Sequence, residues 1–66
     1  MAIAKTIEII AGSSTSFEDA VRQGIAKASE TVEGIQGAWV KDTEVSVSGN
    51  QVTEWRVRLR ITFVVK

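Results

Sequence analysis

Residues 52–65 read Val-Thr-Glu-Trp-Arg-Val-Arg-Leu-Arg-Ile-Thr-Phe-Val-Val, and this stretch decides the fold. Its odd positions from Trp55 to Val65 are apolar, whereas the even positions from Glu54 to Thr62 are polar and include three arginines. Successive side chains of a strand point to opposite faces, so the pattern predicts one long strand with an apolar face and an arginine-rich face. A strand of about fourteen residues exceeds the usual five or six. The arginine-rich face must therefore be solvated or covered by something other than this chain.

The residues before this strand are predicted to supply its neighbours. Residues 36–47 form the preceding strand, because Ser48-Gly-Asn-Gln51 has the composition of a tight hairpin turn. A first strand is predicted at residues 3–11 from its alternating pattern. Between the two lies a predicted helix at residues 16–33, whose apolar side chains recur at three- and four-residue steps. That apolar stripe consists of Phe17, Ala20, Val21, Gly24, Ile25, Ala28 and Val32.

Polar residues and glycines mark the ends of the predicted helix. Thr15 has capping-box spacing to Glu18, and Ser16 is an equally suitable N-cap. Gly34 is placed to end the helix in a left-handed conformation. Gly24 lies within the apolar stripe, which indicates close approach of the helix to the sheet.

The order strand, helix, strand, strand predicts an α+β fold, with one β-α-β-β domain over residues 1–66. If the first strand joins the free side of the third, the sheet is antiparallel in the order 1-3-2. One helix then covers one face through a right-handed crossover. The other face carries the arginines with Thr6, Glu8, Asp42 and Glu44. This arrangement is consistent with a ladder of cross-strand ion pairs, or with arginines that face a ligand.

Composition excludes several classes of function. Eight basic and eight acidic side chains give a formal net charge of zero, which argues against a nucleic-acid-binding module. No stretch is long enough to span a bilayer and no export signal is evident, so the cytoplasm is the expected compartment. The absence of Cys and His excludes disulfides and zinc-type sites. A domain of 66 residues is marginal alone, so self-association is the favoured source of stability.

The sequence offers no convincing catalytic group. With neither His nor Cys present, Ser13, Ser14 and Ser16 are better explained as turn and cap residues. We therefore predict a protein that is not an enzyme. Trp55 is expected in the core or in an interface. Trp39 is expected to cover the core edge, to meet another subunit, or to stack on a planar ligand.

Four segments together resemble the dodecin family over essentially the whole chain. They are Lys5-Thr-Ile-Glu-Ile-Ile10, Gly12-Ser-Ser-Thr-Ser-Phe-Glu-Asp-Ala20, Ala28-Ser-Glu-Thr-Val32 and Trp55-Arg-Val-Arg-Leu-Arg-Ile-Thr-Phe63. The resemblance implies a β-α-β-β protomer that assembles into a hollow homododecamer. It also implies storage or buffering of a flavin (riboflavin or FMN) between subunits, rather than catalysis.

The resemblance also implies a binding site, with two of its residues altered. The family's stacking tryptophan at the start of the second strand corresponds to Gly37, and its ring-binding glutamine corresponds to Arg56. An acidic residue near the ligand corresponds to Asp42. Trp39, two residues beyond Gly37, is expected to compensate in part from the same face. Arg56 suits an anionic ligand such as a phosphorylated flavin.

Two alternatives remain at this stage. A subgroup of dodecins that lacks the flavin tryptophan is associated with calcium, and Asp42 and Glu44 would supply carboxylates brought together by symmetry. The same shell without flavin would bind such a cation or act as a scaffold. From another class, the arginine stripe near Trp55 suggests an RNA-binding sheet, but the neutral charge disfavours it. Trp55 also points to the opposite face from the arginines.

Overall fold

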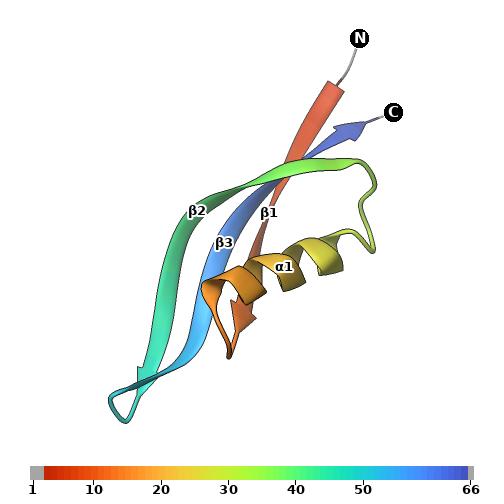
Figure 1. The fold of residues 1–66 in the computed structure, drawn as a ribbon. Helices are drawn as coiled ribbons and strands as arrows, with labels where there is room; N and C mark the ends of the chain where they lie inside the picture. Colours follow the sequence, from red (N-terminus) through yellow and green to blue (C-terminus); the bar gives the residue numbers. More distant parts are fainter. Residues whose placement is uncertain (1–2, 66) are drawn as a thin grey trace.

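The computed structural model describes residues 3–65, which form four elements in the order strand, helix, strand, strand (Figure 1). The three strands make one antiparallel sheet in the order β1-β3-β2. The predicted α+β architecture and the predicted strand order are therefore confirmed. The elements are β1 (Ile3–Ser13), α1 (Phe17–Ala28), β2 (Ile35–Ser48) and β3 (Gln51–Val65).

The protomer is elongated, with principal extents of 52 × 19 × 14 Å. α1 packs against β1 and β3, and the hairpin of β2 and β3 runs on past the helix (Figure 1). Much of the helix-side face of β2 is consequently left uncovered within the protomer. α1 has 12 residues, and no helix of the described part is long and apolar enough to cross a membrane.

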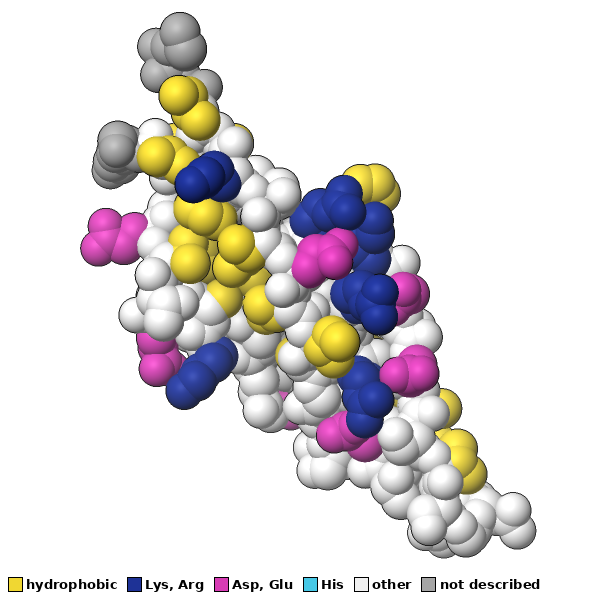
Figure 2. Space-filling view, turned by 180° about the vertical axis from the view of Figure 1, so that it is seen from behind, with side chains coloured by type: hydrophobic (Ala, Val, Ile, Leu, Met, Phe, Trp, Pro, Cys, Tyr) yellow, Lys and Arg dark blue, Asp and Glu magenta, His cyan; other side chains and the backbone are white. Residues whose placement is uncertain are grey.

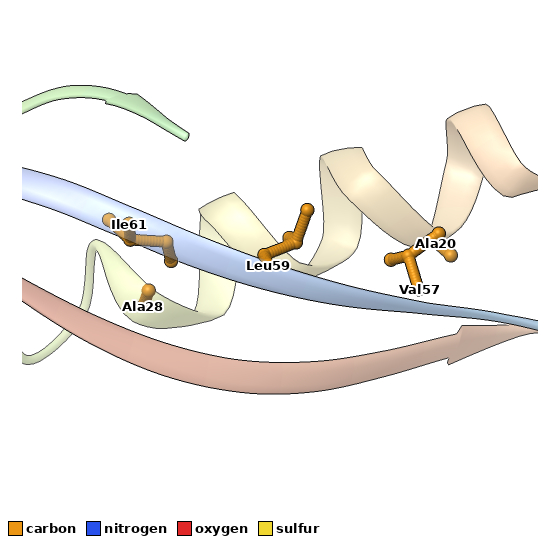
Figure 3. Close-up of a cluster of buried hydrophobic side chains, with 5 residues drawn as sticks. All are labelled: Ala20, Ala28, Val57, Leu59 and Ile61. Atoms are coloured by element: carbon orange, nitrogen blue, oxygen red, sulfur yellow. The ribbon is translucent and has the colours of Figure 1, made fainter. Parts of the chain in front are cut away.

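The core lies between α1 and the apolar face of β3. Val57, Leu59 and Ile61 are at most 1% exposed, and they face Ala20 and Ala28 of the helix (Figure 3). These three strand residues are alternate positions of the stretch that predicted the fold, so the expected apolar face is confirmed.

Gly24 allows α1 to approach the sheet closely. A Cβ atom at this position would lie 3.0 Å from the Cβ of Ala11 and 3.1 Å from Cδ1 of Leu59. Both distances are shorter than an ordinary carbon–carbon contact of about 3.5–4.0 Å. The structure therefore confirms the predicted reason for a glycine within the apolar stripe.

Ser16 caps α1, which resolves the choice between the two candidate N-caps. Its Oγ accepts a hydrogen bond of 3.0 Å from the backbone N–H of Asp19. The buried Ser13 hydroxyl donates a 2.6 Å hydrogen bond to the Asp19 carboxylate and accepts one of 2.9 Å from the Thr15 N–H. The loop between β1 and α1 is thus held by serine hydroxyls, as expected for turn and cap residues.

Ser16→Ala is expected to lower the free energy of unfolding by about 1 kcal/mol, because one N–H at the helix start loses its acceptor. For a domain of this size that corresponds to a fall in Tm of about 4–8 °C. Ser14→Ala, in the same loop at an exposed position, is the matched control and should change Tm little. Equal losses in the two variants would contradict the capping role.

The prediction that the helix extends to residue 33 was wrong, because α1 ends at Ala28. Hydroxyl groups compete for the last carbonyls: Ser29 Oγ donates to the Ile25 carbonyl at 2.8 Å and Thr31 Oγ1 to the Ala28 carbonyl at 3.3 Å. The Thr31 N–H also bonds to the Ala28 carbonyl, a tighter i→i−3 turn. Gly34 has a φ of 77°, as predicted, although it follows this turn and not the helix.

The hairpin between β2 and β3 has the predicted position. Its two central residues, Gly49 and Asn50, have φ values of 60° and 63°. Positive φ at both positions is the signature of a type I′ turn, which matches the twist of antiparallel strands. The strands extend one residue further on each side than predicted, to Ser48 and Gln51.

A β-bulge at Lys41 reorganises β2. Trp39 pairs with Arg60, whereas Asp42 pairs with Arg58, and the register shifts between Val40 and Asp42. Trp39 and Asp42 are an odd and an even position, so simple alternation would place them on opposite faces. The extra residue brings both to the arginine-rich face of the sheet.

Candidate functional site

The sheet face opposite α1, hereafter the open face, carries a ladder of ion pairs. Arginine nitrogens of β3 lie within 3.2–3.9 Å of carboxylate oxygens on the two flanking strands. Figure 2 shows the resulting band of interleaved basic and acidic side chains. Such exposed pairs contribute at most about 1 kcal/mol each, so the ladder fixes orientation more than it stabilises the fold. The pairs are Arg56–Glu44, Arg58–Asp42 and Arg60–Glu8.

Arg56 is held by two carboxylates. Its Nη2 and Nε atoms donate to Glu54 Oε1 at 2.6 and 3.1 Å, and its Nη1 donates to Glu44 at 3.2 Å. The hydrogen bond and negative charge of Glu54 raise the pKa of Arg56 above its ordinary value. Desolvation opposes this rise in pKa, and the charge and hydrogen bond of Glu44 add to it. Arg56 is therefore a fixed cation whose donors are largely engaged within the protomer.

Glu54 takes part in this arrangement because β1 has a glycine beside it. A Cβ atom at Gly12 would lie 2.7 Å from Oε2 of Glu54. Neither Glu54 nor Gly12 was predicted as a site residue. A signal was present, since Glu54 and Arg56 are two residues apart on one strand and thus share a face.

Trp39 stands at the other end of the open face and is 64% exposed. The Nζ atom of Lys41 lies 5.3 Å from the centroid of its ring, and Cζ of Arg60 lies 6.0 Å from it. Both distances are within the range of cation–π contacts. An exposed aromatic ring flanked by two cations can stack on a planar group and attract negative charge. Arg60 was predicted only as one of the arginines on this face. Lys41 was not predicted as a site residue, although it lies two positions from Trp39 and alternation places both on one face.

The predicted ligand residues do not form one cluster within a protomer. Gly37 pairs with Thr62 and Trp39 with Arg60 at one end of the open face. Arg56 lies four residues from Arg60 along β3, a separation of about 13 Å. No atom lies within 4 Å of where a Gly37 Cβ would stand, so this predicted site residue borders open space.

Asp42 and Glu44, the predicted cation ligands, each face an arginine. Asp42 lies 3.9 Å from Arg58 and Glu44 lies 3.2 Å from Arg56. Among residues 3–65, no three acidic side chains gather closely enough to hold a metal ion. Because Ca²⁺ takes six to eight oxygen ligands, a calcium site here would need carboxylates from further copies of the chain.

Three hollows formed by residues 3–65 are lined by side chains other than Trp39. The depression at the centre of the ladder has a volume of about 20 Å³ and is lined by Ile10, Asp42, Glu44, Arg56 and Arg58. That is room for one water molecule. A groove of about 560 Å³ runs between β1 and α1 and is lined mainly by Ile7, Ile9, Ala11, Gly24 and Ala28. A further hollow of about 350 Å³ lies beside the ladder and is lined by Glu8, Ile9, Ile10 and Arg58. It is open to solvent, so a ligand on the open face of one protomer would not be enclosed.

Comparison with known proteins identifies relatives over nearly the whole chain. The family model described as Dodecin matches residues 3–66. The chain is 30% identical over 63 residues to the calcium dodecin of Mycobacterium tuberculosis, covering 96% of this chain and 89% of that protein.

Solved structures agree with this match. A dodecin variant from Thermus thermophilus has a TM-score of 0.95 at 23% identity, with 100% of this chain and 98% of the other covered. The dodecin from Streptomyces davaonensis also gives 0.95, at 22% identity and coverages of 98% and 96%. The calcium dodecin of M. tuberculosis, described as having a novel calcium-binding site, gives 0.84 at 28% identity, with coverages of 97% and 91%.

Proposed function

This chain belongs to the dodecin family of non-enzymatic binding proteins, and we propose that it stores a flavin between the subunits of a hollow homododecamer. The observation that carries the proposal is the exposed indole of Trp39 on the open face. A tryptophan is a suitable platform for the flat isoalloxazine ring, and stacking of a base on an aromatic residue contributes about 1–3 kcal/mol. In this chain Trp39 supplies the stacking ring, because Gly37 has no side chain that could stack.

The apolar surfaces left uncovered in the protomer support assembly. Val40 and Val45 pair across from Leu59 and Trp55 on the helix side of the sheet, yet they are 43% and 42% exposed. Val47, further along β2, is 62% exposed. We refer to these three valines as the β2 strip. Together with the groove beside β1, the strip offers the apolar area that a marginal domain buries by self-association.

A calcium-binding dodecin is the second candidate, favoured by the 30% identity to the calcium dodecin of M. tuberculosis. Asp42 and Glu44 of several copies would be the ligands. Each of these carboxylates faces an arginine within the protomer, and a cation must compete with that positive charge. The local electrostatics therefore favour the flavin proposal.

Native mass spectrometry of the protein as purified, followed by flavin titration, tests the proposal. We expect a twelve-subunit mass and quenching of flavin fluorescence on binding. Trp39→Ala should weaken binding by about one to two orders of magnitude, the equivalent of the lost stacking. Trp39→Phe is the matched control, because it retains an aromatic face and should retain most of the affinity.

Two other results would redirect the assignment. A dodecamer that binds no flavin, but gains thermal stability with added Ca²⁺ and loses it with a chelator, would support the calcium alternative. A monomer at all protein concentrations would contradict the storage assembly itself.

A further inference from the structure

We infer that the Trp39 end of the open face selects a planar ligand that carries a negative charge, with Lys41 and Arg60 binding the anionic group. This inference rests on the proposed ligand site at Trp39 and names the charge of its ligand. The anion site lies at Lys41 and Arg60, and not at Arg56.

Charge is distributed unevenly along the ion-pair ladder. At one end Arg56 faces two carboxylates, those of Glu54 and Glu44. At the Trp39 end Arg60 faces one carboxylate, Glu8, at 3.2 Å. Within residues 3–65, no carboxylate lies within ion-pairing distance of Lys41. Positive charge is therefore in excess beside the tryptophan, and negative charge at the opposite end.

Two strands contribute the cations of this local excess. Lys41 lies two positions from Trp39 on β2, and its Nζ atom lies 5.3 Å from the centroid of the Trp39 ring. Arg60 reaches the same ring because it is the direct cross-strand partner of Trp39. One aromatic face and two cations thus converge from two strands.

A planar anion can contact Trp39, Lys41 and Arg60 at the same time. An exposed cation–π contact is weaker than the stacking of a flat ring on an indole, so a ligand ring can replace a cation at the face of Trp39. The displaced ammonium of Lys41 then remains close to any phosphate or carboxylate that the ligand carries. Arg60 uses one Nη atom for Glu8 and keeps further donors for the same anion.

Arg56 is a poor alternative for this anion. Three of its N–H groups already donate to Glu54 and Glu44, and the two carboxylates repel a second negative charge. An anionic ligand at Arg56 would find two unused N–H groups and would meet the negative charge of both carboxylates. The two ends of the ladder therefore differ in the sign of the charge that they accept.

Riboflavin and FMN are a matched pair of probes, since they share the ring and differ in the phosphate. We expect the intact protein to bind FMN about tenfold more tightly than riboflavin, the equivalent of one charge-assisted hydrogen bond. Lys41→Gln should reduce this ratio severalfold, because only FMN carries the phosphate that the ammonium binds. Added salt should weaken FMN binding more than riboflavin binding.

Lys27→Gln, on α1 on the other side of the sheet, removes the same charge and should preserve the ratio. Equal affinities for the two flavins in the intact protein would overturn the inference and leave the storage proposal standing. So would a preference for FMN that persists unchanged in both Lys41→Gln and Arg60→Gln. Failure of the intact protein to bind either flavin would instead remove the storage proposal, and the inference with it.

Discussion

Leu59→Ala is expected to lower the free energy of unfolding by about 2–5 kcal/mol, the range for a large aliphatic side chain removed from a close-packed core. Leu59 is completely buried at the centre of β3, beneath Gly24 of the helix. A domain of this size has a total stability of roughly 3–10 kcal/mol, so the loss is a large share of it. The variant is expected to be partly unfolded at physiological temperature.

Ile10→Ala is the matched control for this prediction. It removes a side chain of the same size from the neighbouring strand, but Ile10 points to the open face and is 62% exposed. Its cost should stay below about 1 kcal/mol, because little apolar area returns to water. Urea titration at one fixed protein concentration measures both variants, since association shifts the apparent stability. Similar losses would show that the core does not lie where α1 meets β3.

The fold could be predicted largely because its strongest signal is local. Alternation from Trp55 onward fixed the faces of β3, and Gly49 with Asn50 fixed the hairpin that pairs it with β2. The end of α1 could not be predicted from periodicity, because Val32 continues the apolar pattern beyond the last helical turn. Hydroxyl groups of Ser29 and Thr31 donate to the last carbonyls of the helix, and their choice of acceptor depends on the folded turn.

The site was less predictable, because it depends on one inserted residue. Nothing in the residue types from Trp39 to Asp42 marks Lys41 as a bulge. With regular pairing, Trp39 and Lys41 would share one face and Asp42 would point to the other, so the bulge is what places Asp42 beside the arginines. Resemblance to the family directed attention to Arg56, whose donors prove to be engaged by Glu54, a residue two positions away. Burial and partners, which decide a side chain's role, are properties of the folded sheet.

Val45→Asp is expected to break the assembly into smaller species without unfolding the protomer. Val45 belongs to the β2 strip, which α1 leaves uncovered and which we propose to be buried between subunits. An unpaired carboxylate in such an interface loses its hydration, at a cost of several kcal/mol. In a symmetric assembly every copy carries the substitution, so the cost recurs at each equivalent contact.

Size-exclusion chromatography with light scattering measures the mass, and circular dichroism checks that the sheet is retained. Ser14→Asp adds the same charge at an exposed position in the loop before α1, and should leave the mass of the assembly unchanged. If Val45→Asp retains the full mass, β2 does not lie in a subunit interface, and the groove between β1 and α1 becomes the surface to examine. If it dissociates and also loses flavin, the ligand site is completed by a second subunit. That result would agree with the open face of one protomer, where the depression within the ladder holds about one water molecule and the larger hollow beside it is open to solvent.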